Sequence, residues 1–247
     1  MTTHDWLLFR RTLSMSVLLL ALVALVVLST DEAFSTPGMR VARLCAFAPA
    51  IAGIAVLLSF NLARRRGELR ALEALGASPW MAGWGALVAA WLFGAFACVL
   101  LLTPWSDVSS LFPEPPLASG WVAEQQGFFE PAHGIRVLSD GSVSFAAKRA
   151  TIELAPPGRL QALSAVLPLA LVLPAWLLAP LGLGMRAWGL ATSVGFTLVA
   201  LHAVALGRVP EILLPLAAAP LAAQLGFALE RGRMQVTVFS AMLGRRR

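Results

Sequence analysis

Long apolar blocks separated by short polar segments dominate the pattern of this chain. Six stretches approach or reach the roughly 20 apolar residues that a helix needs to cross a bilayer. None of the six contains Asp, Glu, Lys or Arg, and the first is short, but residues 6–9 can extend it into the interface. Prolines within or beside the fourth and sixth stretches predict bent helices there. The stretches are residues 13–28, 44–63, 83–102, 161–181, 188–206 and 212–229.

The composition agrees with this pattern. Hydrophobic residues make up 58% of the 247 positions and charged residues 13%, and the mean hydropathy is +0.78. A soluble domain carries roughly 25% charged residues, so a water-soluble enzyme and a disordered chain are both disfavoured. We therefore expect an all-α polytopic membrane protein with six transmembrane helices in a 3+3 order. A small extracytoplasmic insert, residues 104–160, lies between the third and fourth helices.

The basic residues indicate topology. The net charge is +6, and 18 of the 19 basic residues are Arg, clustered at the ends of the apolar blocks and not in one patch. This distribution is typical of loops that flank transmembrane helices and disfavours a nucleic-acid partner. With six crossings, 12 of the 19 fall on the side that holds both termini. We expect both termini, including a basic tail at 231–247, to be cytoplasmic in a bacterial inner membrane.

The insert shows β signals in its second part. Residues 104–116 are rich in Pro and Ser and indicate a loop. After Gly127, β-prone runs occur at 135–138, 143–146 and 151–154, and Asp140-Gly141 between the first two predicts a hairpin. Three or four such short strands form a small element with little stability of its own.

The loop between the second and third spans, residues 64–77, predicts a short cytoplasmic helix. Residues 64–75 are mostly good helix formers, Gly76 is placed to end the helix, and Ser78-Pro79 can start the next one. At 100° per residue, Arg66, Arg70 and Glu73 share a solvated face. Glu68 instead lies on the apolar side with Leu72 and Leu75.

Two interpretations of Glu68 stay open from the residues alone. It could be a first-turn acid favoured by the helix dipole and paired with Arg64. It could also accept charge-assisted hydrogen bonds from a protein partner inside a small apolar contact.

The segment R-R-G-E-L-x-A-L-x-A-L-G-A-S at 65–78 resembles the coupling helix of the lipopolysaccharide-export permeases. Residues 103–106, residues 179–182 and Arg186 are also similar to that family. The resemblance implies the permease subunit of an ABC-type exporter of a lipid-linked or amphipathic molecule, paired with a second permease copy or paralogue. It implies a separate cytoplasmic ATPase, with Glu68 docking into it. The implied coupling residues are Arg64, Glu68, Leu69, Leu72, Leu75 and Gly76.

Two departures from that family bear on the substrate. The insert at 104–160 is less than half the size of the family's extracytoplasmic domain. Asp31 and Glu32 stand where family members carry basic residues near the outer end of the first helix. Arg40 and Arg43 are therefore only weak candidates for contacts with lipid phosphates. By analogy, the first and fifth spans are expected to line a lipid-sized cavity between two subunits.

The residue pattern suggests neither a catalytic site nor a cofactor site. The single lysine, Lys148, does not follow Gly as a Walker A motif requires, so any ATP hydrolysis belongs to a partner. The three histidines lie in separate regions, and Cys45 and Cys98 lie inside apolar stretches, so no metal site is expected. The main alternative is a mechanotransmission or regulatory permease of the cell-division or macrolide-export type. A membrane enzyme or assembly factor is the third possibility.

Overall fold

The protein is described from a computed structural model, which covers residues 2–29, 36–75, 79–112, 122–124, 127–130, 135–145, 158–205 and 210–244. Within these described ranges, six helices are long and apolar enough to cross a membrane, and each overlaps one predicted stretch. The expectation of an all-α polytopic membrane protein with six spans is therefore confirmed. The spans are Thr3–Ser29, Pro37–Arg65, Trp84–Leu102, Arg159–Leu178, Gly184–Ala205 and Ile212–Arg231.

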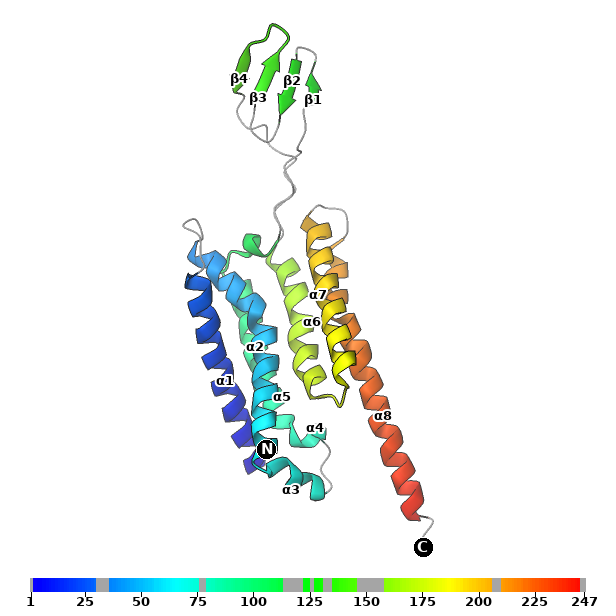
Figure 1. Ribbon diagram of the computed structural model, residues 1–247. Coiled ribbons are helices and arrows are strands. Elements are labelled where there is room, and N and C mark those ends of the chain that lie inside the picture. The colour runs from blue at the N-terminus through cyan, green and yellow to red at the C-terminus, as the bar shows by residue number, and fades with distance from the viewer. Residues whose placement is uncertain are drawn as a thin grey trace.

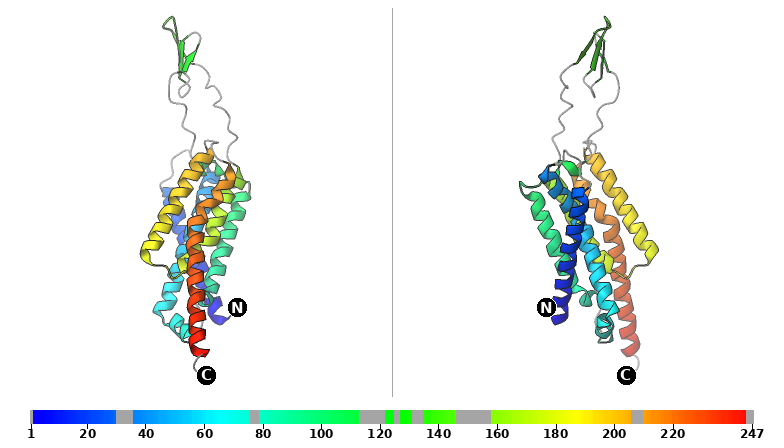
Figure 2. Two further views of the ribbon diagram at one scale, coloured as in Figure 1. Left: turned by 90° about the vertical axis from the view of Figure 1, so that its right-hand side faces the viewer. Right: turned by 60° about the vertical axis from the view of Figure 1, so that its left-hand side comes forward.

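The helices form a bundle, and different elements lie at its two ends (Figure 1, Figure 2). Both chain termini and two short helices, α3 (Glu68–Ala74) and α4 (Pro79–Ala82), lie at one end, which we call the terminal end. A small β-sheet lies beyond the opposite end, called the sheet end. The long helices are α1 (Thr3–Ser29), α2 (Pro37–Arg65), α5 (Trp84–Leu102), α6 (Arg159–Leu178), α7 (Leu183–Ala205) and α8 (Ala219–Gly244).

The first half of the bundle, α1, α2 and α5, packs through small residues. Most buried positions of α2 and α5 are Ala, Gly, Cys or Ser. Between helices in lipid, small residues allow the close backbone approach that van der Waals packing needs. At Gly85 the approach is closest, because an added Cβ would overlap the backbone of Asp5 in α1. Gly94 similarly faces Ala170, which brings α6 onto α5.

The second half, α6, α7 and α8, contains prolines within its helical segments. Pro168 and Pro174 both lie inside an unbroken α6. The sixth span begins as a 3-10 helix, η2 (Glu211–Ala218), which contains Pro215 and passes directly into α8. Proline removes a backbone donor, so a tighter turn at the start of the span accommodates it. The helix α8 then continues to Gly244, through most of the region predicted to be a tail.

The sheet is a four-stranded antiparallel meander in sequence order, β1-β2-β3-β4. The predicted hairpin is present: Gly141 has a φ of 80°, and the Ser142 hydroxyl donates to Asp140 at 2.6 Å. This bond lowers the pKa of the Asp140 carboxyl. The segment 104–116, predicted to be a loop, includes a 3-10 turn, η1 (Val108–Leu111), and residues 151–154 lie outside the described part. The strands are Val122–Glu124, Gly127–Glu130, Ile135–Leu138 and Val143–Phe145.

Candidate functional site

The predicted coupling helix is shorter than expected because the chain turns at Gly67. The helix α2 runs on to Arg65, so Arg64 and Arg65 form its last turn and do not begin a new helix. Gly67 has a φ of 79°, a left-handed conformation that glycine adopts without a steric penalty. The helix α3 starts directly after it, at Glu68. The break was not expected, since residues 64–75 read as one helix.

Glu68 forms a bidentate ion pair with Arg11 of α1. Arg11 Nη1 donates to Glu68 Oε1 at 3.1 Å and to Oε2 at 3.0 Å, and Arg11 Nη2 donates to Oε1 at 3.2 Å. The two side chains are only 19% and 26% exposed. The ion pair of Glu68 is thus made with a residue 57 positions away, while Arg64 lies exposed at the end of α2.

The remaining side chains of α3 divide into an inner and an outer face. Leu69 is 1% exposed and belongs to the hydrophobic core, and Leu72 packs against that core. On the outer face, Arg70 is exposed and Leu75, just after the helix, is 84% exposed. The predicted apolar stripe is therefore divided: Leu72 faces the protein and Leu75 faces away from it.

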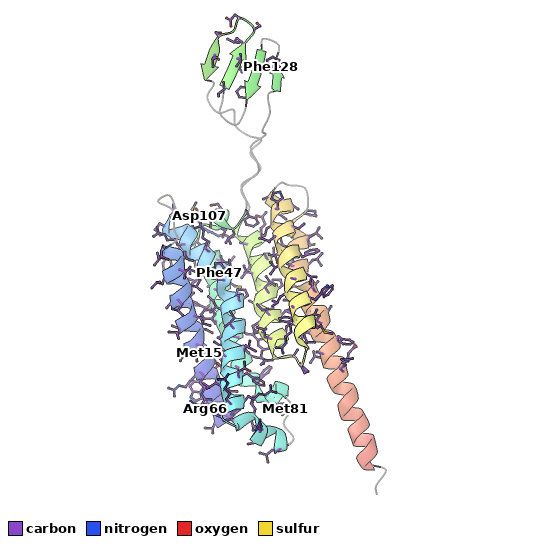
Figure 3. The ribbon with its side chains drawn as sticks, viewed as in Figure 1. Met15, Phe47, Arg66, Met81, Asp107 and Phe128 are labelled. Carbon is purple, nitrogen blue, oxygen red and sulfur yellow. The ribbon has the colours of Figure 1, made fainter. Side chains whose placement is uncertain are left out.

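Beyond α3, the outer face continues onto α4. Met81 is 70% exposed and lies at the terminal end together with Arg66 (Figure 3). Two large apolar side chains, Leu75 and Met81, are thus presented outside the membrane-spanning helices and near one another in the chain. Gly76 and the side chain of Glu73 lie outside the described part. Pro79 begins α4, as its predicted role at the first helical position requires.

A second loop at the terminal end joins α6 to α7. Arg186 Nη2 donates to the carbonyl oxygen of Ala179 at 2.8 Å, and this bond satisfies a backbone acceptor at the end of α6. Pro180 and Gly182 are exposed between them. Arg186 therefore holds the short loop in shape.

At the sheet end, Arg40 and Arg43 occupy the beginning of α2. Both are half-buried, and each has an interaction partner within the chain. Beside them, the Asp107 amide donates to the Gly38 carbonyl at 3.0 Å, which joins the residue before η1 to the start of α2. These two arginines are thus part of the packed end of the bundle.

The two helices predicted to line a cavity, α1 and α7, lie apart (Figure 1). They are also the least buried spans, with 11% and 22% of their most apolar windows buried, against 56% for α5. An open groove of about 660 Å³ runs along the terminal-end half of α1, lined by Trp6, Arg10, Arg11 and Met15 among others. Both helices therefore present uncovered apolar faces.

Sequence reasoning missed Arg11. In the sequence, Arg10 and Arg11 are two of the basic residues that flank the first apolar stretch, which begins at residue 13, but α1 begins at Thr3 and includes both of them. Leu8, Thr12 and Ser16, at four-residue spacing, form the buried stripe of α1. Arg11 is next to that stripe and Arg10 is not, which is the signal that separates the two arginines.

One comparison with known families gives a match. Residues 41–124, about a third of the chain, match the family model described as FtsX-like permease C-terminal. This region runs from α2 through α3, α4 and α5 to the first strand. The match supports a permease of the ABC transporter class, a transport subunit that works with an ATPase subunit, and it does not single out the lipopolysaccharide-export permeases. No curated protein and no solved structure matches the chain.

Proposed function

We propose that this protein is the membrane-spanning subunit of an ABC-type exporter that moves a lipid-linked or amphipathic molecule, such as lipopolysaccharide, and that α3 couples it to a separate ATPase. The observation that carries the proposal is the outer face of α3 and α4. Leu75 and Met81 are exposed apolar side chains at the terminal end, within the region that matches a permease model. We take these two side chains as the part of the surface that a protein partner would cover.

The proposed orientation places the terminal end in the cytoplasm of a bacterial inner membrane. Twelve of the 19 basic residues belong to segments on that side, and an excess of Arg and Lys in short loops marks the cytoplasmic face. An ATPase would meet α3 there.

A second permease, either another copy or a paralogue, would complete the transport path. The apolar faces of α1 and α7 are uncovered and lie apart in one subunit. In a pair of subunits, α1 of one could face α7 of the other across a space wide enough for acyl chains. Arg40 and Arg43 remain weak candidates for phosphate contacts, because both already have partners within the chain.

The second candidate function is a mechanotransmission permease that carries ATPase motion across the membrane without passing substrate. The matched family model supports this second candidate, because the model is FtsX-like and not specific to lipopolysaccharide export. The sheet at the far end of the bundle is the part that such motion would reach. Reconstitution separates the two functions: an exporter, purified with its ATPase, removes labelled lipid from vesicles when ATP is added, and a mechanotransmission permease does not.

The orientation is tested by labelling single cysteines in a background without Cys45 and Cys98. We expect Asp140→Cys, in the exposed hairpin, to react with a membrane-impermeant maleimide from the extracytoplasmic side only. Leu75→Cys should react only after the membrane is opened. Labelling of Asp140→Cys from the cytoplasmic side alone would refute the orientation and, with it, the ATPase contact.

The ATPase contact is tested by Leu75→Asp. Burying a new carboxylate at an apolar contact should weaken retention of the co-purified ATPase at least about tenfold, equivalent to about 1.4 kcal/mol. Val143→Asp is the control, because Val143 is also well exposed but lies in the sheet. Equal retention of the ATPase by both variants would remove the outer face of α3 from the proposal.

A further inference from the structure

The Arg11–Glu68 pair joins α1 and α3, two helices that are not consecutive in the chain. The chain passes from α2 into α3 through the turn at Gly67. Arg11 belongs to α1, on the other side of the chain's first loop. Three hydrogen bonds of 3.0 to 3.2 Å connect them.

This geometry is more specific than a surface ion pair. An Arg guanidinium and a carboxylate that bond through two nitrogens and two oxygens fix orientation as well as distance. Both side chains are mostly buried, so each charge depends on the other for its polar contacts. A first-turn acid that merely favoured the helix dipole would be solvated and would need no such partner.

The Arg11–Glu68 pair also contributes to the stability of α3. The helix has seven residues, and isolated helices shorter than about 12 residues are marginal in water. Its stability must come from tertiary contacts, which are the buried Leu69, the half-buried Leu72 and the Arg11–Glu68 pair.

We propose that Arg11 and Glu68 form a clasp that makes α3 and α1 move as one body, so that a displacement of α3 by its partner reaches α1 directly. The inference rests on the proposed function and deepens it by naming the route of coupling. The helix α1 leaves most of its surface uncovered and packs on α2 and α5, so a displacement passed through the clasp reaches the contacts of α1 with both helices. Glu68 is then a positioning residue, and the partner contacts the outer face at Leu75 and Met81.

The test compares charge variants of the full-length protein with its ATPase in lipid nanodiscs. Arg11→Glu and Glu68→Arg each place two like charges together, and the double variant restores an ion pair of reversed polarity. We expect each single variant to raise amide hydrogen exchange of residues 68–74 at least tenfold and the double variant to return it to within about threefold of the original. Arg10→Glu is the matched control, since Arg10 is exposed next to Arg11 and should leave exchange unchanged.

A second measurement detects movement of α1, whereas hydrogen exchange reports the stability of α3. In a background without Cys45 and Cys98, Trp6→Cys on α1 is labelled with a fluorescent maleimide, and its emission is recorded with and without a non-hydrolysable ATP analogue. We expect a nucleotide-dependent change that the single charge variants abolish and the double variant restores. Trp188→Cys on α7, also an exposed tryptophan, is the matched control and should respond to nucleotide equally in all variants.

Each outcome decides the proposal. If Glu68→Arg releases the ATPase while Arg11→Glu retains it, and the double variant gives no rescue, Glu68 is a docking residue and the clasp is refuted. If the single variants do not accumulate, Arg11→Gln and Glu68→Gln take their place: equal rises in exchange support the clasp, and a rise in only one refutes it. If no ATPase accompanies the unaltered protein, the proposed function fails, whereas the exchange measurements still decide whether the clasp exists.

Discussion

The two halves of the membrane bundle are joined by different chemistry. In the second half, neutral hydrogen bonds cross between helices deep in the bundle: Trp176 Nε1 donates to Gln224 Oε1 at 2.9 Å, and the Ser193 hydroxyl donates to the Ala217 carbonyl at 2.6 Å. In the first half, the spans meet through small side chains, and the charged link between α1 and α3 lies at the terminal end.

The polar residues of the two halves therefore have different roles. Thr12, Ser16 and Ser59 in the first half are fully buried, and among the described residues their hydroxyls have no hydrogen-bond partner. They fill space as small residues do. In the second half, Gln224 is bonded to Trp176 and also packs on Gly189. We expect the second half to depend on specific hydrogen bonds and the first half to depend on close packing of small residues.

The largest expected effect comes from the closest contact in the first half. Gly85→Ala adds a Cβ that overlaps the backbone of Asp5, so α1 must shift, and overpacking of this kind costs about 2 to 3 kcal/mol. Thermal unfolding in detergent, followed by size-exclusion chromatography, should show a clear loss of stability. Gly195→Ala is the control, because a Cβ there meets nothing within 4 Å and alanine favours the helix. Equal unfolding temperatures would show that the contact of α1 with α5 is looser than described.

The second prediction concerns the buried hydrogen bond of the second half. Gln224→Leu leaves the Trp176 N–H without an acceptor and should cost about 1 to 2 kcal/mol. Replacing both partners, with Trp176→Phe added, should recover part of that loss, because no unpaired donor remains. A double-mutant cycle on unfolding in mild detergent measures this coupling. Strictly additive losses would mean that the bond does not hold α6 to α8.

The smallest expected effect is a difference in salt sensitivity between the halves. Raising the ionic strength from about 0.05 M to about 1 M shortens the screening length to about 3 Å and should weaken the Arg11–Glu68 pair by up to about 1 kcal/mol. Hydrogen exchange of residues 68–74 should then rise by up to about fivefold. Hydrogen exchange of residues 219–228 of α8, which are held by a neutral hydrogen bond, should not change with salt. A similar rise in both segments would contradict the proposed difference between the two halves.

Periodicity and charge predicted the parts of the fold that the bilayer imposes. The six spans, the 3+3 order and the hairpin at residues 139–142 all follow from apolar length and turn chemistry, and the structure has them. The bounds at the terminal end were wrong where a single residue decides them. Gly67 ends α2 and starts α3 although the residues on both sides are good helix formers, and helix propensity alone does not show which glycine will adopt a positive φ.

The candidate site also has features that the sequence predicts and features that only the tertiary structure shows. The sequence alone determined that α3 carries two acids and two leucines between the second and third spans, because these residues are local and their types are read directly. Only the tertiary structure decided that Glu68 and Leu69 face the protein, that Leu75 faces away, and that Arg11 is the partner of Glu68. The physical reason is that an ion pair between residues 57 positions apart depends on how α1 packs against α2 and α5. That packing depends on small residues such as Gly85, whose effect is steric and leaves no periodic pattern in the sequence.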